Sequence, residues 1–301
     1  MSWQRLGRVF AAAEGPGWMV SHAANPVAAE VDGSRCRIFF NSRDRLKRSS
    51  VGSLTLCVDT LLVSDVSAGP ELSFGETGAF DDSGVSLGCV VREGADRFLY
   101  YVGWNLGVTV PFRNSIGLAV SRDGAPFCRV SAAPVLDRSR VDPFSLSYPW
   151  VLKQGSTWKM WYGSTVRWRA EPGEQDHVIK YAESPDGIEW HPTGEVCIDC
   201  REPDSYAVSR PCVLCEQGRF RMWFSYRGSR YRIGYAESAD GVHWERTDGA
   251  RGLEPQGDGW ESESVEYAHV FDCGDRRYAL YCGNGYGATG FGLARWEGAE
   301  P

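Results

Sequence analysis

Short runs of alternating apolar and polar residues, separated by turns rich in Gly and Asp, occupy almost the whole chain. Two of these stretches are near twins: VIKYAESPDGIEWHP at 178–192 and YRIGYAESADGVHWER at 231–246. An Asp-Gly dipeptide between two alternating runs is a hairpin signal, because both turn positions tolerate positive φ. Helical periodicity of useful length is absent from the sequence, so the pattern predicts an all-β protein.

The twins are the clearest copies of a repeat that extends through the chain. Each copy begins with a strand, a polar turn and an aromatic-rich strand, as in RPCVLCEQGRFRMWF. Aligning positions 26, 88, 149, 211 and 268 gives spacings of 62, 61, 62 and 57 residues. Five four-stranded units predict a single five-bladed β-propeller domain at 1–301. We expect its blades at about 20–75, 76–137, 138–199, 200–256 and 257–301 plus 3–9.

The two ends of the chain complement each other. The fifth copy stops at ARWEGAEP without a fourth strand, whereas the chain begins SWQRLGRVF. Trp3 can take the place of Trp190 and Trp244, which open the last strand of the third and fourth copies. We therefore expect residues 3–9 to form the outer strand of the last blade and to close the ring.

Composition and charge narrow the class of protein. The 301 residues are 43% hydrophobic and carry a net charge of −7, which suits a packed core and is too polar for a membrane span. This net negative charge argues against a nucleic-acid partner. The N-terminal segment has no apolar run of signal-peptide length, so we expect a cytoplasmic protein whose ten cysteines are reduced thiols. The oligomeric state stays open.

Two motifs resemble cofactor sites but fit the strand pattern better. Cys197 and Cys200, with Cys212 and Cys215, have the spacing of a zinc site. PCVLCE reads as a strand, however, where residues three apart point to opposite faces. GYGATG at 285–290 leads into the strand FGLARW rather than into a helix, so a hairpin loop is favoured over a dinucleotide site. We expect neither a metal nor a cofactor.

The candidate site lies in polar residues that differ between copies. Repeated carboxylates such as Glu183 and Glu237 are explained by turn formation, whereas the starts of the inner strands vary. These starts are expected to converge at the mouth of a central funnel, where several carboxylates would suit glycosidic-bond chemistry. Alternatively, some of these carboxylates form ion pairs with Arg113 or Arg210 and have no catalytic role. Aromatic residues near loops that do not repeat, such as Trp104, Trp168 and Tyr226, are candidates for stacking on sugar rings.

With its MWY, MWF, SRDG and AESxDGxxW segments, the chain resembles the five-bladed propeller glycosidases along its whole length. These are the invertase, levansucrase and arabinanase/xylosidase families and the related mannoside phosphorylases, and the chain looks most like uncharacterised intracellular bacterial members. In the hydrolases an Asp-Pro in the first blade supplies the nucleophile or base, a second Asp stabilises the transition state, and a Glu is the acid. Asp142 in RVDPF resembles the second element. The first element departs from the pattern, because AANPV places Asn25 before the proline.

The resemblance implies an enzyme that acts on a glycoside or sugar conjugate. We expect Asp142 as stabiliser, Glu263 as proton donor and Asp82 as base. The expected sugar-binding residues are His22, Asn25, Asp81, Trp104, Arg113, Tyr148, Tyr206, Arg210, Tyr226, Glu266 and Tyr267.

Two alternatives remain open. One is a phosphorylase, transferase or lyase in which Arg113 or Arg210 holds phosphate or a sugar carboxylate. The other is a carbohydrate-binding propeller without catalysis. Two carboxylates about 5–10 Å apart across an open bowl would favour an enzyme.

Overall fold

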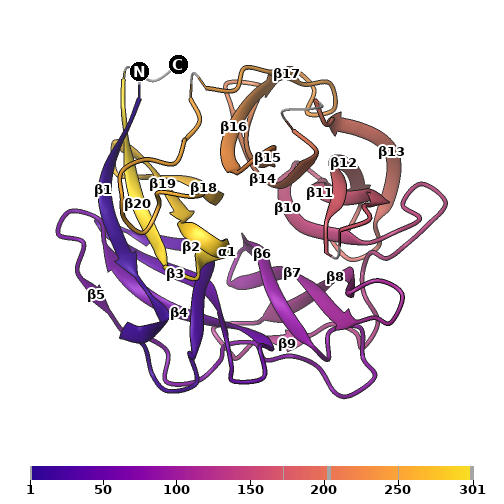
Figure 1. Ribbon diagram of the computed structural model, residues 1–301, viewed down its shortest axis with the longest axis horizontal. Coiled ribbons are helices and arrows are strands. Elements are labelled where there is room, and N and C mark those ends of the chain that lie inside the picture. The colour runs from indigo at the N-terminus through magenta and orange to yellow at the C-terminus, as the bar shows by residue number, and fades with distance from the viewer. Residues whose placement is uncertain (1, 172, 202–204, 250, 299–301) are drawn as a thin grey trace.

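The computed structural model describes residues 2–171, 173–201, 205–249 and 251–298, and its regular structure is almost entirely β-strand (Figure 1). The strands form one four-stranded sheet and two eight-stranded sheets, and a single parallel bridge divides each larger sheet into two antiparallel groups of four strands. The first is β2 (Ser21–Asp32), β3 (Arg35–Arg43), β4 (Ser49–Cys57) and β5 (Val63–Ser64). The second is β6 (Gly84–Glu93), β7 (Asp96–Leu106), β8 (Phe112–Ser121) and β9 (Cys128–Arg129).

The remaining three groups repeat this plan. The third is β10 (Leu146–Gln154), β11 (Thr157–Trp168), β12 (Gln175–Ser184) and β13 (His191–Ile198). The fourth is β14 (Ala207–Glu216), β15 (Arg219–Arg227), β16 (Tyr231–Ser238) and β17 (Glu245–Arg246). The fifth is β18 (Glu266–Cys273), β19 (Arg276–Cys282), β20 (Phe291–Glu297) and β1 (Ser2–Phe10). The predicted all-β class is confirmed.

The groups lie around a common centre, with β2, β6, β10, β14 and β18 nearest to it (Figure 1). Single parallel bridges, Ser49 with Gly84 and His177 with Ala207, link the first group to the second and the third to the fourth. Helical structure in the described ranges is limited to the 3-10 turn η1 (Ala12–Glu14) and the short α1 (Asn284–Gly287). None of the described helices is long and apolar enough to cross a membrane.

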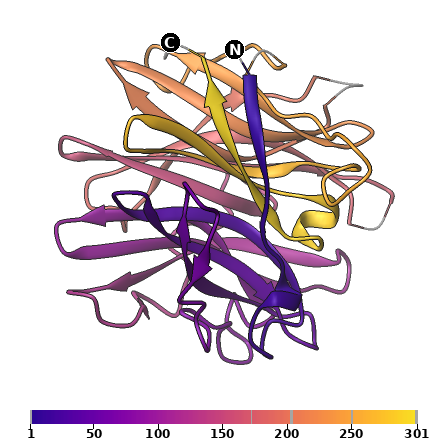
Figure 2. The same cartoon turned by 90° about the vertical axis from the view of Figure 1, so that its left-hand side faces the viewer.

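The first strand of the chain lies beside the last one. β1 pairs antiparallel with β20 from Ser2 opposite Glu297 to Phe10 opposite Phe291, and the two run side by side in both views (Figures 1 and 2). The Trp3 ring packs edge-on against Trp296, with 5.1 Å between ring centroids. Its Nε1 donates a 2.8 Å hydrogen bond to the Arg251 carbonyl. The N-terminal strand is thus anchored by aromatic packing as well as by its ladder.

The twin segments owe their shared sequence to one turn geometry. Ser184 Oγ accepts a 2.9 Å hydrogen bond from the Gly187 amide, and Asp186 Oδ1 accepts one of 2.8 Å from the Ile188 amide. Ser238 and Asp240 accept the same bonds from their own turn. Gly187 and Gly241 have φ of 79° and 83°, which favours glycine. Turn chemistry therefore explains the repeated serine, aspartate and glycine.

A second repeated device joins each of three loops to its group of strands. The hydroxyls of Tyr101, Tyr162 and Tyr281 donate hydrogen bonds of 3.0, 2.8 and 2.8 Å to the carboxylates of Asp81, Asp142 and Glu261, and each pair is 20 residues apart. Asp142 is fully buried and also accepts hydrogen bonds from Ser164 and Lys180. Because this arrangement recurs, it belongs to the framework.

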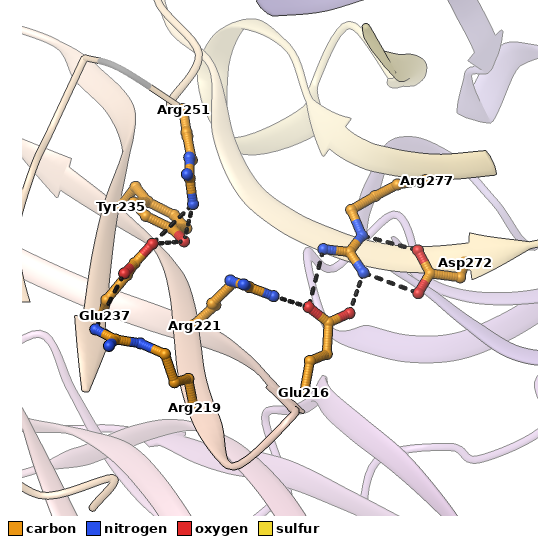
Figure 3. A network of polar contacts seen from close by, with 8 residues as sticks. All are labelled: Glu216, Arg219, Arg221, Tyr235, Glu237, Arg251, Asp272 and Arg277. Atoms are coloured by element: carbon orange, nitrogen blue, oxygen red, sulfur yellow. Dashed lines mark hydrogen bonds and ion pairs between the residues drawn. The ribbon is translucent and has the colours of Figure 1, made fainter. Parts of the chain in front are cut away.

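Ion pairs connect the fourth and fifth groups at the end of β14 away from its first residues. The guanidinium groups of Arg221 and Arg277 both bind the Glu216 carboxylate, and Arg277 also binds Asp272 at 2.8 Å (Figure 3). Beside them, Glu237 accepts hydrogen bonds from Tyr235 at 2.7 Å and Arg251 at 2.8 Å. Arg277 is buried, and these carboxylates compensate the positive charge of its guanidinium group.

Removal of the Trp3 ring tests how strongly β1 holds the fifth group. We expect Trp3→Ala to lower the free energy of unfolding by about 3–5 kcal/mol, because a buried aromatic and its hydrogen bond are lost. Gln4→Ala, an exposed neighbour on the same strand, serves as the control and should change it by less than about 0.5 kcal/mol. Denaturant unfolding measures both. Equal stability of the two variants would contradict this role.

Asp142→Asn tests the framework role of the repeated carboxylates. The amide leaves the buried Lys180 ammonium without its ion-pair partner, so we expect a loss of about 3 kcal/mol in unfolding free energy. Asp137→Asn is the matched control, since that exposed carboxylate receives only a hydroxyl and an amide and should stay within about 0.5 kcal/mol of the wild type. A stable Asp142→Asn protein would overturn the assignment.

Candidate functional site

A pocket of about 300 Å³ opens where the five inner strands come together. We call it the central pocket, and every group of strands contributes to its walls. The first two groups supply His22, Ala24, Asn25, Asn41, Arg43, Ser49, Ser86, Phe112 and Asn114. The other three supply Ser147, Tyr148, Gly173, Glu174, Gln175, His177, Ala207, Ser209, Arg227, Tyr231, Tyr267 and Tyr286. A site assembled in this way can contact one small ligand from all sides.

Bulges in the inner strands turn residues toward the pocket. The antiparallel register shifts at corresponding places in β2, β6, β10, β14 and β18. Four of the shifts contain a residue with left-handed φ: Asn25 at 51°, Tyr148 at 38°, Arg210 at 54° and Tyr267 at 60°. This conformation is strained for residues other than glycine, and bulges of this kind re-aim side chains beside binding sites.

Four tyrosines form one wall of the central pocket. The Tyr148 and Tyr267 rings are 5.0 Å apart between centroids, and Tyr231 lies 5.6 Å from Tyr286. Tyr267 also contacts Tyr231 and Tyr286, at 6.3 and 6.2 Å. These rings come from three different groups of strands, and their faces and hydroxyls suit a ligand with both apolar and hydroxyl-bearing surfaces.

The only carboxylate among the described residues that line the central pocket is Glu174. Arg227 Nη1 donates to both of its oxygens, at 2.9 and 3.1 Å, and the Tyr206 hydroxyl donates at 2.9 Å. The same guanidinium nitrogen donates a 3.4 Å hydrogen bond to the Tyr286 hydroxyl. Glu174 is therefore held in place by a cation and a phenol.

A second carboxyl group, Glu266, adjoins the tyrosine wall, since it precedes Tyr267 in the chain and binds the Tyr286 amide. Its Oε1 accepts hydrogen bonds from the Tyr286 amide at 2.8 Å and the Ser264 hydroxyl at 3.2 Å. Its Oε2 is buried and has no hydrogen-bond partner in the structure. Only 1% of the residue is exposed, and this burial raises the pKa of Glu266 to about 7. At neutral pH the group can therefore donate or accept a proton.

The two histidines of the central pocket are neutral at physiological pH. Burial, together with the positive charge of Arg43, lowers the pKa of His22 to about 4. Burial likewise lowers the pKa of His177 to about 4, and its Nδ1 is left without a hydrogen-bond partner. A neutral imidazole carries one donor and one acceptor, so both rings can bind hydroxyl groups.

Several of the residues predicted from sequence meet at this site. His22, Asn25, Tyr148 and Tyr267 line the central pocket. Glu266 contacts Tyr286 of the pocket wall through a hydrogen bond, and Tyr206 binds Glu174.

Other predicted residues lie elsewhere. Asp142 and Asp81 are buried in the framework, where Asp81 is bound by Arg129 at 2.8 Å. The Glu263 side chain is exposed and lines none of the hollows described here. Arg210 is buried and does not line the pocket; its Nη1 donates to the Leu87 carbonyl, its guanidinium lies 5.5 Å from the Tyr148 ring centroid, and burial lowers its pKa. Tyr226 is buried against Phe224.

Three predicted residues line hollows beside the central pocket. Asp82 and Trp104 line a neighbouring groove, and Arg113 lines a smaller hollow that also contacts Asp82. Trp168 packs edge-on against Phe112, with 5.4 Å between ring centroids. The carboxylates expected at the funnel mouth therefore do not gather there as a group.

Sequence reasoning missed Arg43, Glu174, His177, Arg227 and Tyr286, all of which line the pocket. None of these five residues lies at the start of an inner strand, where the sequence pattern predicts the polar residues of the site. In an antiparallel pair the end of the second strand lies beside the start of the first, and Arg43 pairs with Ser21 just as Arg227 pairs with Ala207. Including those strand ends would have found both arginines.

Comparison with known proteins gives relatives for the whole chain. It is 48% identical over 300 residues to two proteins of Mycobacterium tuberculosis, the uncharacterized proteins MT1551 (strain CDC 1551) and Rv1502 (strain H37Rv); the match covers 99% of this chain and all of each relative. No family model matches the sequence.

Among solved structures, a glycoside hydrolase superposes with a TM-score of 0.76 and 15% identity, over 97% of this chain and 90% of its own. A structure from the GH130 family of mannoside phosphorylases, which contains glycoside hydrolases for β-1,2 mannosidic linkages in Candida mannan, gives 0.74 and 14%, over 99% and 94%. At this identity the likeness concerns the fold. The chain therefore belongs to the family of the M. tuberculosis proteins MT1551 and Rv1502, and its fold is that of the propeller-like glycoside hydrolases and mannoside phosphorylases.

Proposed function

We propose that this protein is an enzyme that cleaves or transfers a glycosidic bond of a sugar or sugar conjugate bound in the central pocket, with Glu266 as the proton donor. The observation that carries the proposal is a buried carboxyl group with one unbonded oxygen and a pKa of about 7 beside the pocket wall. The shared fold with glycoside hydrolases supports the reaction class. We interpret the five strand groups as the blades of one five-bladed domain, which β1 closes.

Glu266 replaces Glu263 as the proposed donor for a physical reason. Glycoside cleavage needs a carboxyl group that is still protonated near neutral pH, so that it can protonate the departing oxygen. Burial keeps a large fraction of Glu266 protonated there, and its orphaned Oε2 needs a polar partner. The Glu263 side chain is exposed to solvent and is therefore not desolvated in this way.

Glu174 is the carboxylate that we assign to stabilise positive charge on the sugar ring. The transition state of glycoside cleavage resembles an oxocarbenium ion, so a fixed negative charge nearby lowers its energy. Arg227 and Tyr206 fix Glu174 within the pocket. This role passes from Asp142, because Asp142 is fully buried in the framework whereas Glu174 lines the central pocket. Two carboxyl groups in such different environments are typical of acid–base pairs.

The remaining walls suit a sugar. The tyrosine faces can stack on the C–H surface of a pyranose or furanose ring, and the amides of Asn25 and Asn114 with the imidazoles of His22 and His177 can bind its hydroxyls. Asn25 Oδ1 is buried without a hydrogen-bond partner, which leaves an acceptor for one such hydroxyl. A binding protein without catalysis would need the same walls but gives no reason for the desolvated Glu266.

Glu266→Gln tests the proposed donor directly. We expect turnover of nitrophenyl glycosides, measured with and without phosphate to separate phosphorolysis from hydrolysis, to fall by about two to four orders of magnitude. Wild-type activity should decline as pH rises above about 7, because the donor is then deprotonated. Glu263→Gln is the control, since this exposed residue lies three positions away, and it should keep activity within about twofold. Full turnover by Glu266→Gln would remove Glu266 from the mechanism.

The raised pKa also predicts a pH dependence of stability. The fold favours the protonated carboxyl group, so its contribution is present below the ordinary pKa of 4.5 and is lost as pH rises through about 7. Between pH 5 and 8 the unfolding free energy of the wild type should fall relative to Glu266→Gln by roughly 2–3 kcal/mol. The buried histidines act equally in both proteins and cancel. Parallel curves would contradict the desolvation of Glu266.

A further inference from the structure

A groove of about 600 Å³ leads sideways from the central pocket, between the first and second strand groups. We call it the side groove. It shares Arg43, Ser86, Phe112, Asn114 and Tyr148 with the pocket, so the two hollows adjoin each other. A ligand seated in the central pocket can therefore extend a substituent into the side groove.

One wall of the side groove is cationic in an acidic protein. The hairpin between β3 and β4, residues 42–48, reads SRDRLKR and holds four basic residues and one acidic residue, against a net charge of −7 for the chain. Arg43, Lys47 and Arg48 line the groove. Arg48 is paired with Asp44 at 2.8 Å, whereas Arg43 and Lys47 form no ion pair within the described ranges.

Two charges are thus left for a ligand. Arg43 stands at the junction of the two hollows, where its charge contributes to lowering the pKa of His22. Asp82 is the one carboxylate among the described residues of the groove, and its oxygens already accept hydrogen bonds from the Gly78 amide at 3.0 Å and the Ser83 hydroxyl at 2.9 Å. An unpaired guanidinium with a nearby ammonium matches the charge and fork geometry of phosphate.

Another part of the groove's lining is aromatic and apolar. Trp104 and Phe112 form it, and both remain partly exposed. Their rings are fixed from behind: the Trp104 Nε1 donates a 3.0 Å hydrogen bond to the Ser49 hydroxyl, and Phe112 packs against Trp168. The groove therefore offers both cations and flat apolar surface to a ligand.

We propose that the side groove binds a phosphate-bearing part of the sugar substrate, so that the substrate is a sugar phosphate or diphosphate conjugate with its sugar in the central pocket and its phosphate at Arg43 and Lys47. This inference rests on the proposed function for the sugar, but the anion site itself does not require turnover. It moves the expected phosphate contact from Arg113 and Arg210 to Arg43. Arg210 is buried and lines neither hollow, and Arg113 lines a different one.

Calorimetric titration of the full-length protein with inorganic pyrophosphate and with uridine diphosphate, at one low ionic strength, tests the site. We expect both ligands to bind the wild type and Arg43→Gln to weaken both by at least about tenfold, as for the loss of a charge-assisted hydrogen bond. Arg45→Gln is the matched control, since Arg45 is an exposed arginine on the same hairpin that lines neither hollow. It should bind within about twofold of the wild type.

The outcomes separate the sources of recognition. Equal affinity for the two ligands would assign recognition to phosphate alone, and tighter uridine diphosphate would add stacking on Trp104 and Phe112; either supports the proposal. Absence of binding, or unchanged binding by a folded Arg43→Gln protein, would overturn it. Glu266→Gln should bind pyrophosphate as the wild type does, so a failure of the proposed chemistry is distinguishable from a failure of the anion site.

Discussion

Desolvation of polar side chains where the inner strands converge is the constraint on which the site depends. Burial raises the pKa of Glu266 to about 7 and lowers the pKa of His22 and His177 to about 4. Burial also lowers the pKa of Arg210. Each shift has the sign that a low-dielectric surrounding dictates, because the charged form loses its hydration. The same burial that packs the centre therefore prepares a protonated acid and neutral imidazoles beside one pocket.

Carboxylates occur both in the framework and at the site. Those of the framework recur at equivalent positions in several strand groups, whereas those of the site do not. Asp81, Asp142 and Glu261 each accept a hydrogen bond from a tyrosine 20 residues later, so their carboxylates hold loops to strands. Glu174 and Glu266 have no such counterpart, and both lie at the central pocket or its wall. The bulges that repeat in the inner strands carry Asn25, Tyr148 and Tyr267 to the pocket, whereas the bulge of β14 buries Arg210.

Much of the architecture could be predicted from the sequence, because hairpin turns and repeat spacing are local signals. The Asp-Gly turns at Gly187 and Gly241 and the pairing of β1 with β20 lie where the pattern places them. The site was harder to predict. Asp142 resembles a catalytic motif yet is neutralised by Lys180, a partner 38 residues away. Glu174 and Arg227 meet only through tertiary structure, and the difference between Glu263 and Glu266 is one of burial, which depends on how β18 packs.

The central claim is that Glu266 is a desolvated acid. Infrared difference spectroscopy of the carboxyl C=O stretch, recorded against pH for the wild type minus Glu266→Gln, measures its protonation without a substrate. We expect an absorption band of the protonated acid that disappears as the pH rises, with a midpoint near pH 7. A midpoint close to the ordinary glutamate value of 4.5 would show a hydrated carboxylate and would contradict the proposed proton donor.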